Sequence, residues 1–182
     1  IDVPEMDDNF LKTIPKPAAI SLRHTGDGKG NQYDLKKIEA QEIKRAYYAT
    51  ISFLDAQIGR ILKKLKDTGL DKNTIVVFSS DHGYHLGEKG HWQKQTLYEK
   101  STRVPLIFSG PEIEAGKRSN SPVELIDIYP TLMDLTQIQK PDHVVGKSLV
   151  PIFNNPKHKI RNSALTRWIL TVSYTHLRAH ET

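Results

Sequence analysis

The sequence has no cysteine among its 182 residues. This excludes disulfides, thiolate metal ligands and cysteine nucleophiles from the chain as given. It also lacks an apolar run near the roughly 18 residues that a membrane-spanning helix requires, and its mean hydropathy is -0.50. The chain begins at Ile1, without a basic segment followed by an apolar one, so a signal peptide is either absent or lies upstream.

The size and charge of the chain limit the number of domains it can form and the partners it can be expected to bind. At 182 residues and 37% hydrophobic content, it is long enough for one sizeable core, which favours one domain or part of one. The net charge of +5 could suggest a polyanionic partner. However, the basic residues are scattered, and the densest group (Lys63, Lys64 and Lys66) falls on an amphipathic helix pattern. A solvated helix face is the commoner meaning of such a group, so we expect no nucleic-acid partner.

The order of predicted elements indicates an α/β fold. Residues 1–34 carry proline and glycine with little periodicity, which indicates an irregular segment. Apolar residues then recur every three or four positions from about residue 36, which predicts a long helix that ends at Gly69. Residues 74–79 and 104–108 are short apolar runs typical of strands buried on both faces of a parallel sheet, and a short helix is expected over 95–102 between them.

The start of the last predicted helix depends on one proline. A start at Ser121 would match a capping box but would place Pro130 deep in the helix, at a cost of about 3 kcal/mol. A start at Asp127 places Pro130 in the first turn, where the missing N–H is harmless. We therefore predict a short extended piece over 123–126 and a helix over 127–136.

Candidate chemistry gathers in residues 79–94, directly after the first predicted strand, where ligands collect in open α/β sheets. Asp81 offers carboxylate oxygens and His82 a ring nitrogen, a pair that can contribute to one cation but cannot hold it alone. The plainer interpretation is a turn cap followed by a polar loop residue. Lys94 could meet an anionic substrate, or it could be an ordinary solvated lysine. His85 and His91 could likewise be functional residues or ordinary polar residues of the loop.

Five collinear segments resemble the sulfatase family. The Asp-His-Gly-Tyr-His-Leu-Gly-Glu run with the following Gly-His-Trp-Gln-Lys resembles a signature region of that family. Residues 101–107 continue this region, and three further segments agree in order: 48–60, 123–132 and 146–149. The resemblance covers roughly residues 35–168, and it is nearest to the iduronate-sulfatase-like branch, whose members also carry Asp-His at this point.

The resemblance implies an alkaline-phosphatase-like layered sheet with flanking helices, of which the N-terminal half is missing. It implies hydrolysis of sulfate esters, on a sulfated glycan, by a periplasmic or extracellular parent enzyme. Asp81 and His82 would supply part of a divalent metal site, usually Ca2+, and Lys94 would be a catalytic, substrate-binding residue on a sulfate oxygen. The nucleophile would be a formylglycine made in a Cys/Ser-x-Pro-Ser/Thr-Arg motif, which the chain does not contain.

The last eleven residues, 172–182, resemble a translated sequencing adaptor, so we exclude them from fold reasoning. The expected organisation is then a fragment of a sulfatase catalytic domain over 1–171, with the start of its C-terminal subdomain, followed by a non-native tail. Such a fragment, expressed alone, is expected to be inactive and to fold poorly.

Two other functions remain open. Related enzymes of the same superfamily hydrolyse phosphodiesters or phosphonate esters with a similar metal cradle, and a noncatalytic binding protein could keep the fold after losing the nucleophile. The nucleophile motif in the upstream sequence would distinguish the three.

Overall fold

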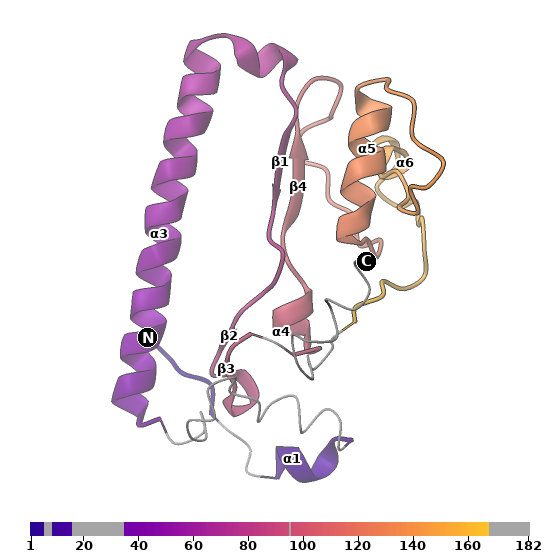
Figure 1. Cartoon of the computed structure of the whole chain (residues 1–182). Coiled ribbons are helices and arrows are strands. Elements are labelled where there is room, and N and C mark those ends of the chain that lie inside the picture. Colours follow the sequence, from indigo (N-terminus) through magenta and orange to yellow (C-terminus); the bar gives the residue numbers. More distant parts are fainter. Residues whose placement is uncertain (6–8, 16–34, 95, 168–182) are drawn as a thin grey trace, which may run out of the picture.

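The computed structural model describes residues 1–5, 9–15, 35–94 and 96–167 (Figure 1). Its α-helices are α1 (Phe10–Thr13), α3 (Lys37–Asp67), α4 (Glu99–Thr102), α5 (Ile128–Leu135) and α6 (Val150–Asn154). Its strands are β1 (Val76–Ser79), β2 (His85–Leu86), β3 (Trp92–Gln93) and β4 (Leu106–Ser109). Short 3-10 helices are η2 (Leu70–Asn73), η3 (Glu88–Gly90) and η4 (Leu125–Asp127). Most of residues 1–34 and the whole 172–182 tail lie outside the described residues.

The long helix α3 follows the predicted pattern. At its start, the backbone N–H of Lys36 donates to Oε2 of Glu39 at 2.9 Å, which satisfies one of the unpaired groups at a helix end. At its other end, Lys63 pairs with Asp67 at 2.6 Å, and Gly69 adopts a left-handed φ of 71°. The predicted helix and its glycine stop are therefore confirmed. None of the described helices is both long enough and apolar enough to cross a membrane.

The apolar face of α3 has little cover. Figure 1 shows α3 beside the β1–β4 ribbon rather than enclosed by other elements. Many of its large apolar side chains are exposed, with Phe53 and Ile61 both at 68%. The exposed members along this helix are Ile38, Ile43, Tyr48, Ile51, Phe53, Leu54, Ile61 and Leu62.

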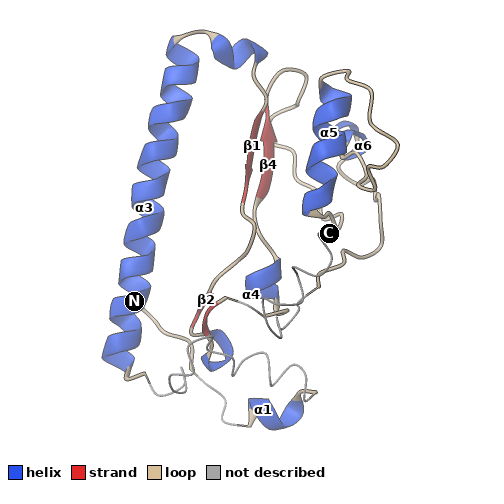
Figure 2. Ribbon diagram, viewed as in Figure 1, coloured by secondary structure: helices blue, strands red, loops and turns tan. Residues whose placement is uncertain are grey.

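The two strands β1 and β4 lie where the sequence predicts strands, but they pair antiparallel, with Val76 opposite Ser109 and Phe78 opposite Ile107. The prediction of strands typical of a parallel sheet, buried on both faces, was therefore wrong for this pair. The chain turns back at the end of β1 through β2, β3 and α4, so it returns beside β1 in the opposite direction. A parallel neighbour would need a crossover to the other end. Ile107 is 56% exposed, as expected for a ribbon of two strands (Figure 2).

Helix α4 is shorter than predicted. It spans Glu99–Thr102 rather than 95–102, and the residues after Gln95 form bends. The reason is local: Oγ1 of Thr96 accepts the backbone N–H of Tyr98 at 3.3 Å, which gives that N–H a partner outside a helix.

Helix α5 begins where the proline argument places it. Residues 125–127 form the 3-10 turn η4, where the prediction had an extended piece over 123–126, and α5 follows from Ile128. The side chain of Asp127 accepts the N–H of Glu124 at 2.8 Å, and Pro130 is buried in the first turn of the helix. The start of the predicted helix near Asp127 is confirmed.

A segment far along the chain packs onto the start of α5. A Cβ at Gly146 would lie 2.1 Å from the carbonyl oxygen of Ile126, so only glycine permits this approach. Beyond it, Lys147 N–H donates to Asp127 Oδ1, and Leu149 N–H donates to Thr131 Oγ1, both at 2.9 Å.

Arg161 completes the contacts of Asp127. Its guanidinium donates through two nitrogens to the two carboxylate oxygens of Asp127, the second at 2.7 Å, and lies 2.9 Å from Glu124. Burial by itself would raise the pKa of Asp127, but hydrogen bonds from Arg161 and from two backbone N–H groups outweigh it and hold that pKa below its usual range. We call Asp127, Thr131 and Arg161 the Asp127 cluster.

Candidate functional site

The turn after β1 carries the predicted metal ligands. Asp81 is exposed, and its carboxylate has no hydrogen bond or ion pair within the described part of the chain. Ser80 shapes the turn, because its hydroxyl donates to the carbonyl oxygen of His82 at 2.8 Å. The carboxylate of Asp81, predicted to be a metal ligand, is therefore accessible to a ligand.

The ring of His82 is fixed in one orientation. Its Nδ1 lies 2.6 Å from the carbonyl oxygen of Gly83. A carbonyl oxygen can only accept, so Nδ1 of His82 is the donor in this contact. Metal-binding histidines commonly fix their tautomer by this kind of backbone contact. The donor set of Asp81 and His82 thus fits a share in a divalent cation site. Within the described ranges, no group of three or more His, Asp or Glu side chains could hold a metal.

Gly83 anchors this turn to α4. Its N–H donates to the carbonyl oxygen of Ser101 at 2.7 Å. A Cβ at this position would lie 2.0 Å from the carbonyl oxygen of Lys100, a distance that no side chain tolerates. Glycine is required here by close approach of two backbones, and this approach fixes the Asp81 turn relative to the helix.

Lys94 follows the β2–β3 hairpin. Its side chain is exposed, and its carbonyl oxygen accepts from Nε2 of His91 at 3.3 Å. The preceding residue, Gln93, has φ 74°, in the left-handed region that non-glycine residues seldom occupy. Unfavourable backbone angles of this kind concentrate at functional positions and persist only when the surroundings hold them.

A buried polar cluster lies under the hairpin. His85, His91, Thr96 and Ser101 are each at most 2% exposed, and we call them the His85 cluster. Burial, followed by the nearby His91, lowers the pKa of His85 to about 4, so its ring is neutral at pH 7. Sequence reasoning left His85 and His91 undecided. No periodicity marks these four positions, which come together only when the hairpin folds back on α4.

The two parts of the candidate site lie at the same end of the β1–β4 ribbon. Figure 1 shows β2, β3 and α4 beyond the end of β1, and the Asp81 turn connects β1 to β2. Asp81 comes two residues after β1, and Lys94 comes directly after β3. Convergence of the Asp81 carboxylate and the Lys94 ammonium on one point stays a prediction.

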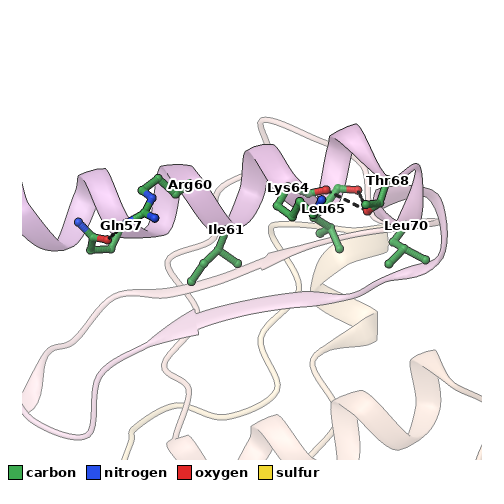
Figure 3. A pocket seen from close by; sticks show the side chains of 7 residues that line it. All are labelled: Gln57, Arg60, Ile61, Lys64, Leu65, Thr68 and Leu70. Atoms are coloured by element: carbon green, nitrogen blue, oxygen red, sulfur yellow. Dashed lines mark hydrogen bonds between the residues drawn. The ribbon is translucent and has the colours of Figure 1, made fainter.

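A hollow of about 780 Å³ lies at the other end of α3 (Figure 3). In this view the side chains of Ile61 and Leu65 point from α3, and that of Leu70 from η2, toward the strands. The full lining is Gln57, Arg60, Ile61, Lys64, Leu65, Thr68 and Leu70. It contains no carboxylate and no histidine, so it is part of the uncovered apolar face of α3 rather than of the Asp81 site.

Comparison with known proteins identifies the family. The family model described as Sulfatase matches residues 10–138. The chain belongs to the sulfatase family. A protein named Sulfatase from Formosa agariphila is 39% identical over 150 residues, which cover 82% of this chain and 29% of that protein. The chain therefore spans less than a third of the length of this relative.

Two solved structures show what the fold is like. A structure described as in complex with its substrate, D-glucosamine-2-N,6-O-disulfate, aligns with a TM-score of 0.64 and 32% identity, over 87% of this chain and 33% of that one. A phosphonate monoester hydrolase from Silicibacter pomeroyi aligns with a TM-score of 0.62 and 31% identity, over 75% of this chain and 26% of that one. The predicted α/β fold class of the sulfatase and alkaline-phosphatase-like type is confirmed.

Proposed function

We propose that this chain is part of a sulfatase that hydrolyses sulfate esters, and that it supplies one half of the metal site and one sulfate contact. The observation that carries the proposal is the Asp81 turn. It combines an exposed carboxylate with an adjacent histidine whose Nδ1 is held by the carbonyl oxygen of Gly83, and the backbone of Gly83 packs directly against α4. The sulfatase family match makes sulfate esters the first substrate class to test.

The metal would be a divalent cation, with Ca2+ as the first candidate. Asp81 would provide a hard oxygen ligand and His82 a nitrogen ligand, and the remaining ligands would come from sequence outside this chain. When bound, such a cation orients an ester oxygen and offsets its charge. The Gly83 contacts hold the backbone of this turn against α4.

Lys94 would bind a sulfate oxygen. As the S–O bond breaks, negative charge grows on the sulfate and its leaving group, and a positioned ammonium lowers the energy of that state more than that of the ground state. The nucleophile in this proposal is a formylglycine supplied by a segment outside the chain. Residues 1–171 would then be part of the catalytic domain, in an enzyme that acts in the periplasm or outside the cell.

A sulfated glycan is the proposed substrate class. The support is the solved relative whose described substrate is a disulfated glucosamine, at 32% identity over most of this chain. The phosphonate monoester hydrolase at 31% identity supports a second candidate, hydrolysis of phosphonate or phosphate esters by the same half-site. The two proposals differ in the charge and geometry of the transferred group, so matched substrates distinguish them.

The test uses a full-length protein that contains this chain. An aryl sulfate and an aryl phosphonate with the same leaving group are assayed with Ca2+ present and after chelation. Turnover of the sulfate should dominate and should fall on chelation. Lys94→Ala should lower kcat by about 10²–10³-fold. Asp81→Ala should in addition raise the Ca2+ concentration needed for half-maximal activity.

Matched controls come from the neighbouring pair Asp71 and Lys72 in η2, both exposed and at the far end of β1. Asp71→Ala and Lys72→Ala should leave kcat and the Ca2+ requirement unchanged. Faster turnover of the phosphonate would favour the second candidate. Unchanged kinetics in both Lys94→Ala and Asp81→Ala would refute the assignment of the site.

A further inference from the structure

We propose that His85 and Thr96 are positioning residues that hold Lys94 in place from beneath, through the His85 cluster. The inference rests on the proposed role of Lys94 and goes beyond it, because neither residue would touch the substrate. The contacts of the cluster connect the β2–β3 hairpin, the segment after Lys94 and α4.

Thr96 is the centre of the cluster. Its Oγ1 lies 2.9 Å from Nε2 of His85, donates to Oγ of Ser101 at 3.0 Å, and accepts the N–H of Tyr98 at 3.3 Å. These three contacts tie the segment after Lys94 to β2 and to α4. Thr96 is only 2% exposed, so water does not compete for these bonds.

His91 holds the same segment from the other side. Its Nε2 donates to the carbonyl oxygen of Lys94 at 3.3 Å, and its ring packs edge-on against the ring of His85, with 4.8 Å between ring centroids. The backbone of Lys94 is therefore fixed at its own carbonyl and again two residues later at Thr96. Directly before Lys94, the last residue of β3, Gln93, keeps a left-handed φ of 74°, which needs such external support.

The protonation of His85 follows from the same contacts. With the Thr96 hydroxyl proton directed to Ser101, His85 Nε2 must be the donor to Thr96 Oγ1. Nδ1 is then an unprotonated acceptor, and it is buried without a hydrogen-bond partner among the described residues. An apolar side chain would avoid this cost. The one hydrogen bond of this buried ring goes to Thr96, so its role in the proposal is to hold the segment that follows Lys94.

The first test is a pair of Thr96 variants in a full-length protein that contains this chain. Thr96→Val keeps the shape but removes the hydroxyl, and it should lower kcat roughly 10–100-fold while KM changes by less than about threefold. Thr96→Ser keeps the hydroxyl and should recover kcat to within about threefold of the wild type. His85→Ala should resemble Thr96→Val, and equal activity of Thr96→Val and the wild type would overturn the proposal.

The second test separates positioning from general destabilisation. Thr96→Val is combined with Lys94→Ala in a double-mutant cycle, and kcat is measured on the ester that the wild type hydrolyses. If Thr96 acts through Lys94, adding Thr96→Val to Lys94→Ala should change kcat by less than about twofold. A loss as large as in the wild-type background would show that Thr96 supports the fold and not Lys94, which overturns the proposal.

Amide hydrogen exchange distinguishes failure of this inference from failure of the proposed function. Peptides that contain Lys94 should exchange faster in Thr96→Val than in the wild type, and at the wild-type rate in Thr96→Ser. If the wild type hydrolyses no sulfate ester but the two variants show this exchange pattern, the proposed function is refuted and the positioning role of Thr96 stands. Unchanged exchange in Thr96→Val would refute the positioning role of Thr96, whatever ester the enzyme hydrolyses.

Discussion

Helix α3 and the two buried clusters are built in opposite ways. Along α3, large apolar side chains such as Phe53 and Ile61 are exposed, whereas the His85 and Asp127 clusters bury histidine, threonine, serine and aspartate almost completely. Most of the buried polar groups are paired with one another or with backbone groups; the His85–Thr96 pair is 11 positions apart in the sequence and the Asp127–Arg161 pair is 34 apart. The apolar face of α3 has few partners within the described ranges, and the stacking of Tyr47 on Tyr84, with 4.9 Å between ring centroids, is one of them.

The difference shows which parts of the structure are self-sufficient. A hydrogen bond is satisfied by one correctly placed partner, and the hairpin, α4 and α5 bring those partners from nearby segments. Hydrophobic stabilisation scales with area removed from water, so a helix of 31 residues needs a broad covering surface. The site loops can therefore keep their geometry, while α3 depends on a surface beyond the described residues. The following variants test that contrast; Gly59→Ala and the variants of the exposed α3 face are studied in purified residues 1–171, and the others in a full-length protein that contains this chain.

The largest effect is expected from Arg161→Met. It leaves the fully buried carboxylate of Asp127 without its charge partner, which should cost about 3–5 kcal/mol of unfolding free energy at pH 7. Arg161→Lys keeps the charge but loses the two-nitrogen contact, and it should cost less. Urea unfolding measures both. A loss below about 1 kcal/mol for Arg161→Met would mean that the Asp127 cluster does not hold α5 to the later segment.

Acidification should weaken the His85 cluster. Burial lowers the pKa of His85 to about 4, while the same group in the unfolded chain titrates near 6.5. Between these values the unfolded state binds the extra proton. The contribution is fully present above about pH 6.5 and is lost as the pH falls toward 4, by up to about 3 kcal/mol. Unfolding free energies of the wild type and His85→Gln across this range measure it, and His158→Gln, at an exposed histidine, is the control. Parallel curves for the wild type and His85→Gln would contradict the prediction.

Substitution by alanine should change the stability in opposite directions at two glycines. Gly83→Ala places a methyl group 2.0 Å from a backbone oxygen, so it should destabilise by more than about 2 kcal/mol and displace the Asp81 turn. Gly59→Ala in α3 has open space around it and should stabilise by about 0.5–1 kcal/mol through helix propensity. Thermal melts compare the two. Equal tolerance of both would show that the backbones at Gly83 do not approach so closely.

The smallest effect on stability is expected on the exposed face of α3. In purified residues 1–171, Ile61→Gln should change the unfolding free energy by less than about 0.5 kcal/mol, because Ile61 is 68% exposed. It should nonetheless reduce self-association, measured by sedimentation, since it shrinks an exposed apolar patch. Lys66→Gln on the same helix should leave association unchanged or increase it. If Ile61→Gln self-associates as strongly as the wild type, the surface responsible for self-association lies elsewhere.

The sequence by itself determined the features that depend on neighbours along the chain. The three- and four-residue spacing of apolar side chains predicted α3, Gly69 marked its end, and Pro130 placed the start of α5 near Asp127. The apolar runs located β1 and β4 to within about two residues. These features follow from helix periodicity, backbone angles and proline geometry, which are local. The Asp-His-Gly motif likewise pointed to the end of β1.

Only the tertiary structure decided which of these pieces meet. The direction of pairing between β1 and β4 depends on the route of the chain through the hairpin and α4, which no local pattern encodes. The contact of Arg161 with Asp127 joins residues 34 positions apart. The pairing of His85 with Thr96 is also set by the tertiary structure, because a buried hydrogen bond requires two groups to be brought together and kept from water. The residue type at either position does not reveal its partner.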